Sequence, residues 1–245
     1  MSNTEFNQLA MTHALPEARL VDRIDDLCAR ARGRSVIHVG FVDTGCRTMN
    51  TGTGTWLHAH LDRVATSLVG VDIDETGVKE AVDAGYEAHA LDARDAAAVE
   101  AAGIEPAQLV IAGEVIEHLS DPGSFLDGMH NLLAPGGQLV ITTPNAYGLI
   151  NVFASLGNKE INHPDHVVMF TWRTLTNLAS RYGWEHVETR MYVPAVKPFE
   201  GGGLSARVLA MAGRFVVGLE RVLGKLGRCY SADGMIVVFR STRRD

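Results

Sequence analysis

The sequence is poor in cysteine and has no long apolar run. Its three cysteines, Cys28, Cys46 and Cys229, are widely spaced and form no Cys-x-x-Cys pair. We therefore expect neither a disulfide framework nor a zinc knuckle, and a reducing compartment fits this pattern. No uninterrupted apolar stretch approaches the roughly 18 residues of a membrane span. The first 20 residues also lack the basic start and apolar centre of a secretory signal, so we predict a cytoplasmic protein.

Positive charge is also scarce. The chain has 22 Lys and Arg against 29 Asp and Glu, a net charge of −7. An acidic surface is a poor match for phosphate groups, so we do not expect nucleic acid as a partner. The charge is uneven, because residues 201–245 hold eight Lys and Arg against three acidic residues. This asymmetry predicts that the C-terminal segment faces a different partner or surface.

The rest of the composition is that of one globular domain, with 46% hydrophobic and 21% charged residues over 245 positions. Short apolar runs alternate with helical patterns, which is typical of parallel strands joined by helices. We predict an α/β, Rossmann-like fold: a seven-stranded, mostly parallel sheet, with helices on both faces and a helical insert before the last strand. The strands are expected at 35–40, 68–74, 86–93, 109–113, 136–145, 184–193 and 234–241, the last two paired antiparallel. Helices are expected at 17–32, 56–65, 75–85, 94–103, 121–133 and 171–182.

No repeat or linker divides the chain, so we predict a single domain, 1–245. Its parts are an N-terminal helical segment (1–33), a core (34–193), a helical insert (194–233), and the last strand with a tail (234–245).

Polar residues and a glycine follow the first three predicted strands. Gly40 ends the first strand, where a backbone without a Cβ can approach a ligand closely. Asp72 ends the second strand, and a carboxylate there can accept hydrogen bonds from both hydroxyls of a ribose. Asp92 ends the third strand, within reach of a base edge. Each alone is typical of a turn or a helix cap, but three successive strand ends together favour a nucleoside ligand.

In these segments the chain resembles the class I S-adenosylmethionine-dependent methyltransferases, over roughly residues 34–192. The resemblance rests on VIHVG, LVGVDID, ALDARD, LVIAGEVIEHL and LLAPGGQLVITTPN. It implies that the Gly40 loop passes the methionine part of S-adenosylmethionine, that Asp72 binds the ribose, and that Asp92 and Ala93 bind the adenine. The other predicted cofactor-binding residues are Asp43, Ile73 and Glu114. The first motif departs from the family, since His38 stands in place of the usual acidic residue and Val42 in place of a second glycine.

The segment GEVIEHL predicts a metal site. If a helical turn begins after the fourth strand, Glu114, Glu117 and His118 share one face. Two neighbouring carboxylates repel each other unless a cation compensates them, and carboxylate oxygens with an imidazole suit Mg²⁺, Mn²⁺ or a similar ion. An acidic helix start, favoured by the helix dipole, is the alternative interpretation.

The segment NHPDHVVMFTW supplies a second group, with His163, Asp165 and His166. The two segments together resemble the metal-dependent 2′-O-methyltransferases of small-RNA 3′ ends, and the ubiquinone-pathway O-methyltransferases share the Glu-x-x-Glu-His part. The resemblance implies four ligands, Glu114, Glu117, His118 and His166, for Mg²⁺, with Mn²⁺ or Co²⁺ as alternatives. His163, Asp165 and His118 are the predicted catalytic residues, with His163 or Asp165 as the proton acceptor.

A metal-bound hydroxyl is acidified and held in place, and two adjacent hydroxyls can chelate one ion. We therefore predict an O-methyltransferase acting on a hydroxyl of a sugar, glycan or glycosylated natural product. An RNA ribose 2′-O-methyltransferase, a methyltransferase for a phenolic small molecule and a non-catalytic cofactor-binding partner protein remain as alternatives.

Residues 204–228 are mostly apolar, with an arginine every seven residues from Arg207 to Arg228. On a helix this spacing makes one slowly drifting stripe. The stripe predicts a helical cap on the core or on a second subunit of a homodimer. The alternative is a surface for a lipid-linked acceptor or a membrane interface.

Overall fold

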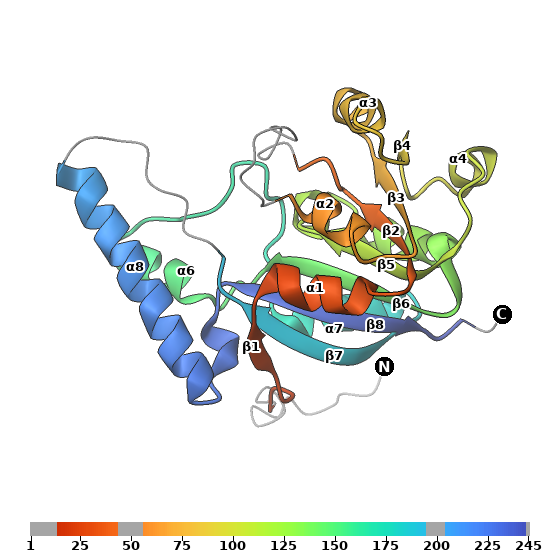
Figure 1. Ribbon diagram of the computed structural model, residues 1–245. Coiled ribbons are helices and arrows are strands. Elements are labelled where there is room, and N and C mark those ends of the chain that lie inside the picture. Colours follow the sequence, from red (N-terminus) through yellow and green to blue (C-terminus); the bar gives the residue numbers. More distant parts are fainter. Residues whose placement is uncertain (1–13, 44–55, 195–203, 244–245) are drawn as a thin grey trace.

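The computed structural model describes residues 14–43, 56–194 and 204–243, and much of the predicted cofactor loop after Asp43 lies outside them. Eight strands form one sheet in the order β1-β7-β8-β6-β5-β2-β3-β4 (Figure 1). Only β8 runs antiparallel to its neighbours. The predicted α/β, mostly parallel fold is confirmed, but the sheet has one strand more than expected. The strands are β1 (Arg19–Val21), β2 (Ser35–Val39), β3 (Ser67–Asp72), β4 (Ala88–Ala90), β5 (Ala107–Gly113), β6 (Leu133–Pro144), β7 (Trp184–Tyr192) and β8 (Gly234–Ser241).

Helices cover both faces of the sheet because alternate strand residues point to opposite sides. The helices are α1 (Arg23–Ala31), α2 (Leu57–Asp62), α3 (Glu75–Asp83), α4 (Ala96–Ala101), α5 (Pro122–Gly128), α6 (Leu149–Leu156), α7 (Trp172–Arg181) and α8 (Leu204–Lys225). In β5, Val110 packs in the core beneath α4, α5 and α7, whereas Ile111 packs in the core beneath α1 and α2.

The additional strand corrects the prediction of a helix over 17–32. Residues 19–21 pair in parallel with residues 190–192 of β7, so β7 is not an open edge. Asp22 then caps α1, since its Oδ1 accepts the backbone N–H of Asp25 at 3.0 Å. The apolar spacing of the segment continued across this cap, and spacing alone does not locate the start of a helix.

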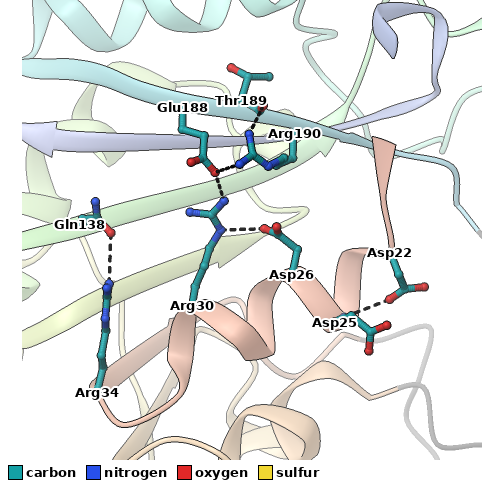
Figure 2. A network of polar contacts seen from close by, with 9 residues as sticks. All are labelled: Asp22, Asp25, Asp26, Arg30, Arg34, Gln138, Glu188, Thr189 and Arg190. Atoms are coloured by element: carbon teal, nitrogen blue, oxygen red, sulfur yellow. Dashed lines mark hydrogen bonds and ion pairs between the residues drawn. The ribbon is translucent and has the colours of Figure 1, made fainter. Parts of the chain in front are cut away.

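Ion pairs attach α1 to the sheet, as Figure 2 shows. The Arg30 guanidinium donates to Asp26, one turn earlier, at 2.7 Å and also to Glu188 of β7. Arg190 reaches the same Glu188 carboxylate at 3.1 Å. Together with buried Leu27 and Ala31, these contacts fix α1 across β7 and place its first residue, Arg23, at the edge of the cleft described below.

Within the segment predicted as an insert before the last strand, the described residues form helix α8 and a short 3₁₀ turn at Cys229–Ser231. Figure 1 shows α8 beside α6, which follows the end of β6 and was not expected from the sequence. No helix within the described part of the chain is both long and apolar enough to cross a lipid bilayer.

Candidate active site

A cleft of about 510 Å³ opens at the carboxyl ends of β2, β3 and β5. Open parallel sheets bind their ligands at this edge. Nearly all of the predicted site residues line this cleft, and Glu117 is fully buried. The predicted residues on its wall are Gly40, Asp43, Asp72, Ile73, Asp92, Ala93, Glu114, His118, His163, Asp165 and His166.

Asp72 organises the first strand end as well as its own. Its Oδ2 accepts the backbone N–H of Val42, and its Oδ1 accepts that of Asp74, both at 3.0 Å. Each carboxylate oxygen retains a second lone pair for a ligand hydroxyl. Ile73, next to Asp72, is one of the most exposed apolar side chains. This pair suits a nucleoside, whose base can pack on the Ile73 side chain while its ribose hydroxyls bind the Asp72 carboxylate.

At the end of β4, Asp92 holds Arg94. The guanidinium donates to both carboxylate oxygens, at 2.6–2.9 Å, and the Arg94 backbone N–H donates to Oδ1 at 2.9 Å. This pairing lowers the pKa of Asp92. Asp92 therefore fixes the position of Arg94 on this wall of the cleft. The neighbouring Ala93 is buried and small, so it does not fill the cleft.

Behind the first motif, His38 replaces the expected acidic residue and pairs with another histidine. His38 Nδ1 lies 3.2 Å from His58 Nδ1, and both rings are buried. Burial lowers the pKa of His38 and brings that of His58 to about 3, so both rings are neutral at physiological pH. Trp56 donates its Nε1–H to the Phe41 carbonyl at 2.8 Å. These rings hold the two ends of the cofactor loop together.

Glu114 has a left-handed backbone, with φ of +57°. Its Oε1 accepts hydrogen bonds from Tyr192 (2.6 Å) and Thr142 (2.8 Å). Arg23 donates to the same Thr142 hydroxyl at 3.0–3.2 Å, and its guanidinium lies 5.7 Å from the Tyr192 ring centroid. Sequence reasoning missed Arg23 and Tyr192. Tyr192 lies at a strand end and could have been found, whereas nothing in the sequence points to Arg23.

The helical turn predicted to align Glu114 with Glu117 and His118 is wrong. The chain leaves β5 through the left-handed Glu114, and only residues 116–118 form a short 3₁₀ turn. The carboxylate of Glu114 is consequently held by β6 and β7 side chains.

Three histidines meet at the mouth of the cleft. Within the described ranges, one nitrogen from each of His118, His163 and His166 lies within 4.8 Å of the others. Two contacts bring their loops together: His118 Nδ1 lies 3.2 Å from the Asp165 carbonyl, and the Glu117 carbonyl accepts the Val167 N–H at 2.8 Å. Burial and the two neighbouring imidazoles lower the pKa of His166, which favours the neutral, ligating form.

Glu117 lies behind His118 and is fully buried. Its Oε2 accepts from the Thr143 hydroxyl at 3.0 Å, while its Oε1 has no hydrogen-bond partner in the described structure. Burial and the Glu114 carboxylate raise the pKa of Glu117 to about 8. An unsatisfied buried oxygen is costly, and a bound cation would satisfy it. Of the four predicted ligands, the structure thus groups His118 and His166, adds His163, and leaves both glutamates outside that group.

Comparison with known proteins agrees with this architecture. A family model described as a methyltransferase domain matches residues 21–189. A crystal structure of an S-adenosylmethionine-dependent methyltransferase from Archaeoglobus fulgidus shares the fold, with a TM-score of 0.52, 15% identity, and coverage of 88% of this chain and 93% of that one. The chain therefore belongs to the methyltransferase-domain family, and its fold is that of the S-adenosylmethionine-dependent enzymes.

More particular relatives are ubiquinone biosynthesis O-methyltransferases. That of Parvibaculum lavamentivorans is 34% identical over 124 residues, covering 49% of this chain and 46% of the relative. The mitochondrial protein of Mus musculus is 30% identical over 161 residues, covering 61% of this chain and 43% of the relative. The matched region thus spans less than half of the length of these two relatives.

Proposed function

We propose that this protein is an S-adenosylmethionine-dependent O-methyltransferase whose acceptor hydroxyl is activated at a divalent metal ion. The observation that best supports this proposal is that one cleft is lined both by the strand-end residues Gly40, Asp72 and Ala93 and by a cluster of three histidines. The first group suits a nucleoside cofactor, and the second suits a metal-bound acceptor. The relatives support O-methylation, because both are named as O-methyltransferases.

The donor set fits a divalent ion. His118, His163 and His166 offer ring nitrogens to one ion, and Glu117, which precedes His118 in the sequence, has an Oε1 without a partner in the described structure. Imidazole and carboxylate together suit Mn²⁺, Co²⁺ and related ions, and Mg²⁺ less well as the number of nitrogen ligands rises. When bound, such an ion lowers the pKa of a coordinated hydroxyl. We assign the role of proton acceptor to Asp165, whose exposed carboxylate lies beside His163, because the histidine is taken up by the proposed metal site.

The acceptor that we propose is a saccharide with two adjacent free hydroxyls. An ion held on one side by protein ligands leaves neighbouring positions for a chelating diol. The cleft offers little surface for ring stacking: among the described residues that line it, Phe125 is the one phenyl or indole side chain. Phe170 is in the hydrophobic core and Trp172 packs against it, so neither serves the acceptor.

A second acceptor class is favoured by a different observation. The relatives of Parvibaculum lavamentivorans and Mus musculus are named for ubiquinone biosynthesis. A phenolic acceptor with neighbouring hydroxyls would use the same metal chelation. The two classes are distinguished by measuring methyl transfer to saccharide diols and to catechols under identical conditions.

The experiment that tests the proposal combines metal binding with activity. We expect Mn²⁺ to bind the purified protein and activity to vanish in excess chelator. In the His163→Ala variant, Mn²⁺ affinity and activity should each fall by at least ~100-fold, on the scale of losing one preorganised polar contact. Affinity for S-adenosylhomocysteine, measured by calorimetry, should change by less than ~3-fold. His89→Ala on β4 is the matched control and should retain metal binding. Full activity in excess chelator would show that the metal-assisted mechanism is incorrect.

A further inference from the structure

Helix α8 has an inner face that packs on the protein. Val216 and Glu220 of this face are buried, and Gly224 lies against Leu20 of β1, where an added Cβ would be 2.7 Å from the leucine Cδ2. Helix α6 packs beside α8 (Figure 1). Because these contacts fix the rotation of α8, they also determine which residues face away from the protein.

The outer face of α8 carries an exposed apolar stripe. Met211, Phe215 and Val222 are separated by four and seven residues, which places them on one side of a helix. Phe215 is 66% exposed and Met211 61% exposed. Leu226, in the turn after α8, continues the stripe and is 71% exposed. Exposed side chains of this size cost solvation free energy unless something covers them.

Cationic side chains border this stripe. Arg214, Arg221 and Lys225 are exposed and fall on one side of it, at spacings of seven and four residues. The sequence of α8 contains one acidic residue, Glu220, and that residue faces inward. The outer face therefore combines apolar and positively charged side chains with no exposed carboxylate among its described positions.

Helix α6 extends the apolar character of this end of the molecule. Val152, Phe153 and Leu156 of α6 are exposed, and α6 packs against α8. Helix α6 follows the carboxyl end of β6, and Figure 1 shows both helices on the same side of the sheet.

We propose that the outer face of α8 binds an anionic lipid membrane surface, with the helix lying along the interface. Apolar side chains flanked by cations are the pattern of an interfacial helix, and no described helix can cross the bilayer. Charge complementarity identifies the occupant: a net charge of −7 repels an anionic surface everywhere except at a local cationic patch, so the patch sets the orientation. This proposal does not depend on the identity of the methyl acceptor.

The test is co-sedimentation of the full chain with vesicles of phosphatidylcholine alone or of phosphatidylcholine mixed with phosphatidylglycerol, since an anionic surface attracts cationic side chains. We expect binding to the anionic vesicles only, weakened by salt. The double variant Phe215→Ser/Val222→Ser should lower the partition coefficient at least ~10-fold, and Arg214→Gln/Arg221→Gln should lower it comparably. The matched control is Val82→Ser on α3, an exposed apolar residue of another helix, which should bind like the natural protein.

A second readout covers any loss of folding in these variants. Phe215→Trp should show a blue-shifted emission maximum when anionic vesicles are added, and Val82→Trp should not. The proposal is overturned if the protein ignores anionic vesicles, or if the α8 variants sediment like the control. It is equally overturned if α8 mediates a homodimer, with the Phe215→Ser/Val222→Ser variant monomeric and neither form bound to lipid.

Discussion

The side chain of Val115 fills the space that a Cβ at Gly40 would occupy. An ideal Cβ there would lie 2.1 Å from Val115 Cγ2, and Gly40 also has a φ of +71°. Gly40, the residue after β2, is thus constrained both by its own backbone and by Val115. This contact links the end of the first motif to the segment that carries the proposed metal ligands Glu117 and His118.

Gly40→Ala should therefore lower the unfolding free energy by more than the backbone strain of a positive φ accounts for. The control is Gly33→Ala, since Gly33 has a similar φ of +72° with nothing within 4 Å of its Cβ position. We expect the control to lose ~1 kcal/mol of unfolding free energy from backbone strain. Gly40→Ala should lose a further ~1–3 kcal/mol from overpacking against Val115. Denaturant unfolding measures both, and equal losses would contradict the steric argument.

Asp72→Ala should weaken S-adenosylmethionine binding by ~2 kcal/mol or more, since the ribose loses a charged acceptor. The Val42 and Asp74 N–H groups also lose their acceptor, so the cofactor loop should loosen. Calorimetry measures the affinity, with Asp83→Ala on the exposed face of α3 as the control. An affinity equal to that of the control would exclude Asp72 from the cofactor site.

The pair of Glu220 and Asp233 should make stability decrease as pH rises. Burial and the Asp233 carboxyl raise the pKa of Glu220 to about 9. Between pH ~4.5 and ~9 the folded protein keeps a proton that the unfolded chain releases, so unfolding becomes easier with increasing pH. Glu220→Gln removes this titration, and its unfolding free energy should vary less over that range. Denaturant unfolding at pH 6, 7.5 and 9 tests this, and parallel curves for both proteins would refute it.

The histidine pair should act in the opposite direction. His58 has a pKa of about 3 in the folded protein, so between pH ~6.5 and ~3 the unfolded chain takes up a proton that the folded one does not. Stability attributable to this ring is present above pH ~6.5 and declines by about 1.4 kcal/mol per pH unit below it. The His58→Phe variant should have an unfolding free energy ~1 kcal/mol lower at pH 7.5, because it loses the hydrogen bond to His38. Its unfolding free energy should then decrease less steeply as the pH falls. The test is to measure the unfolding free energies of the natural protein and of His58→Phe at pH 7.5 and 5. The same loss between the two pH values in both proteins would contradict the low pKa of His58.

The ends of the strands were predictable because short apolar runs mark the strands, and glycine or aspartate residues follow them. Asp72, Asp92 and Glu114 were found in this way, and all line the cleft. The conformation after β5 was not predictable, because a left-handed φ at a glutamate depends on Tyr192 and Thr142, which are distant in sequence. For the same reason His163 was expected as a proton acceptor, whereas the structure places it with His118 and His166. The three residues of β1 escaped detection because their pairing with β7 is a tertiary contact.

The position of β8 has a consequence for how the chain is made. Residues 234–241 lie between β6 and β7, so the described strand that comes last in the chain is the one that joins β7 and β1 to the rest of the sheet. Before β8 pairs, β2 to β6 have all of their mutual neighbours, whereas β7 can pair with β1 but is not joined to β6. We therefore expect β6 to present an open strand edge until β8 pairs with it, and an unpaired edge of this kind favours aggregation.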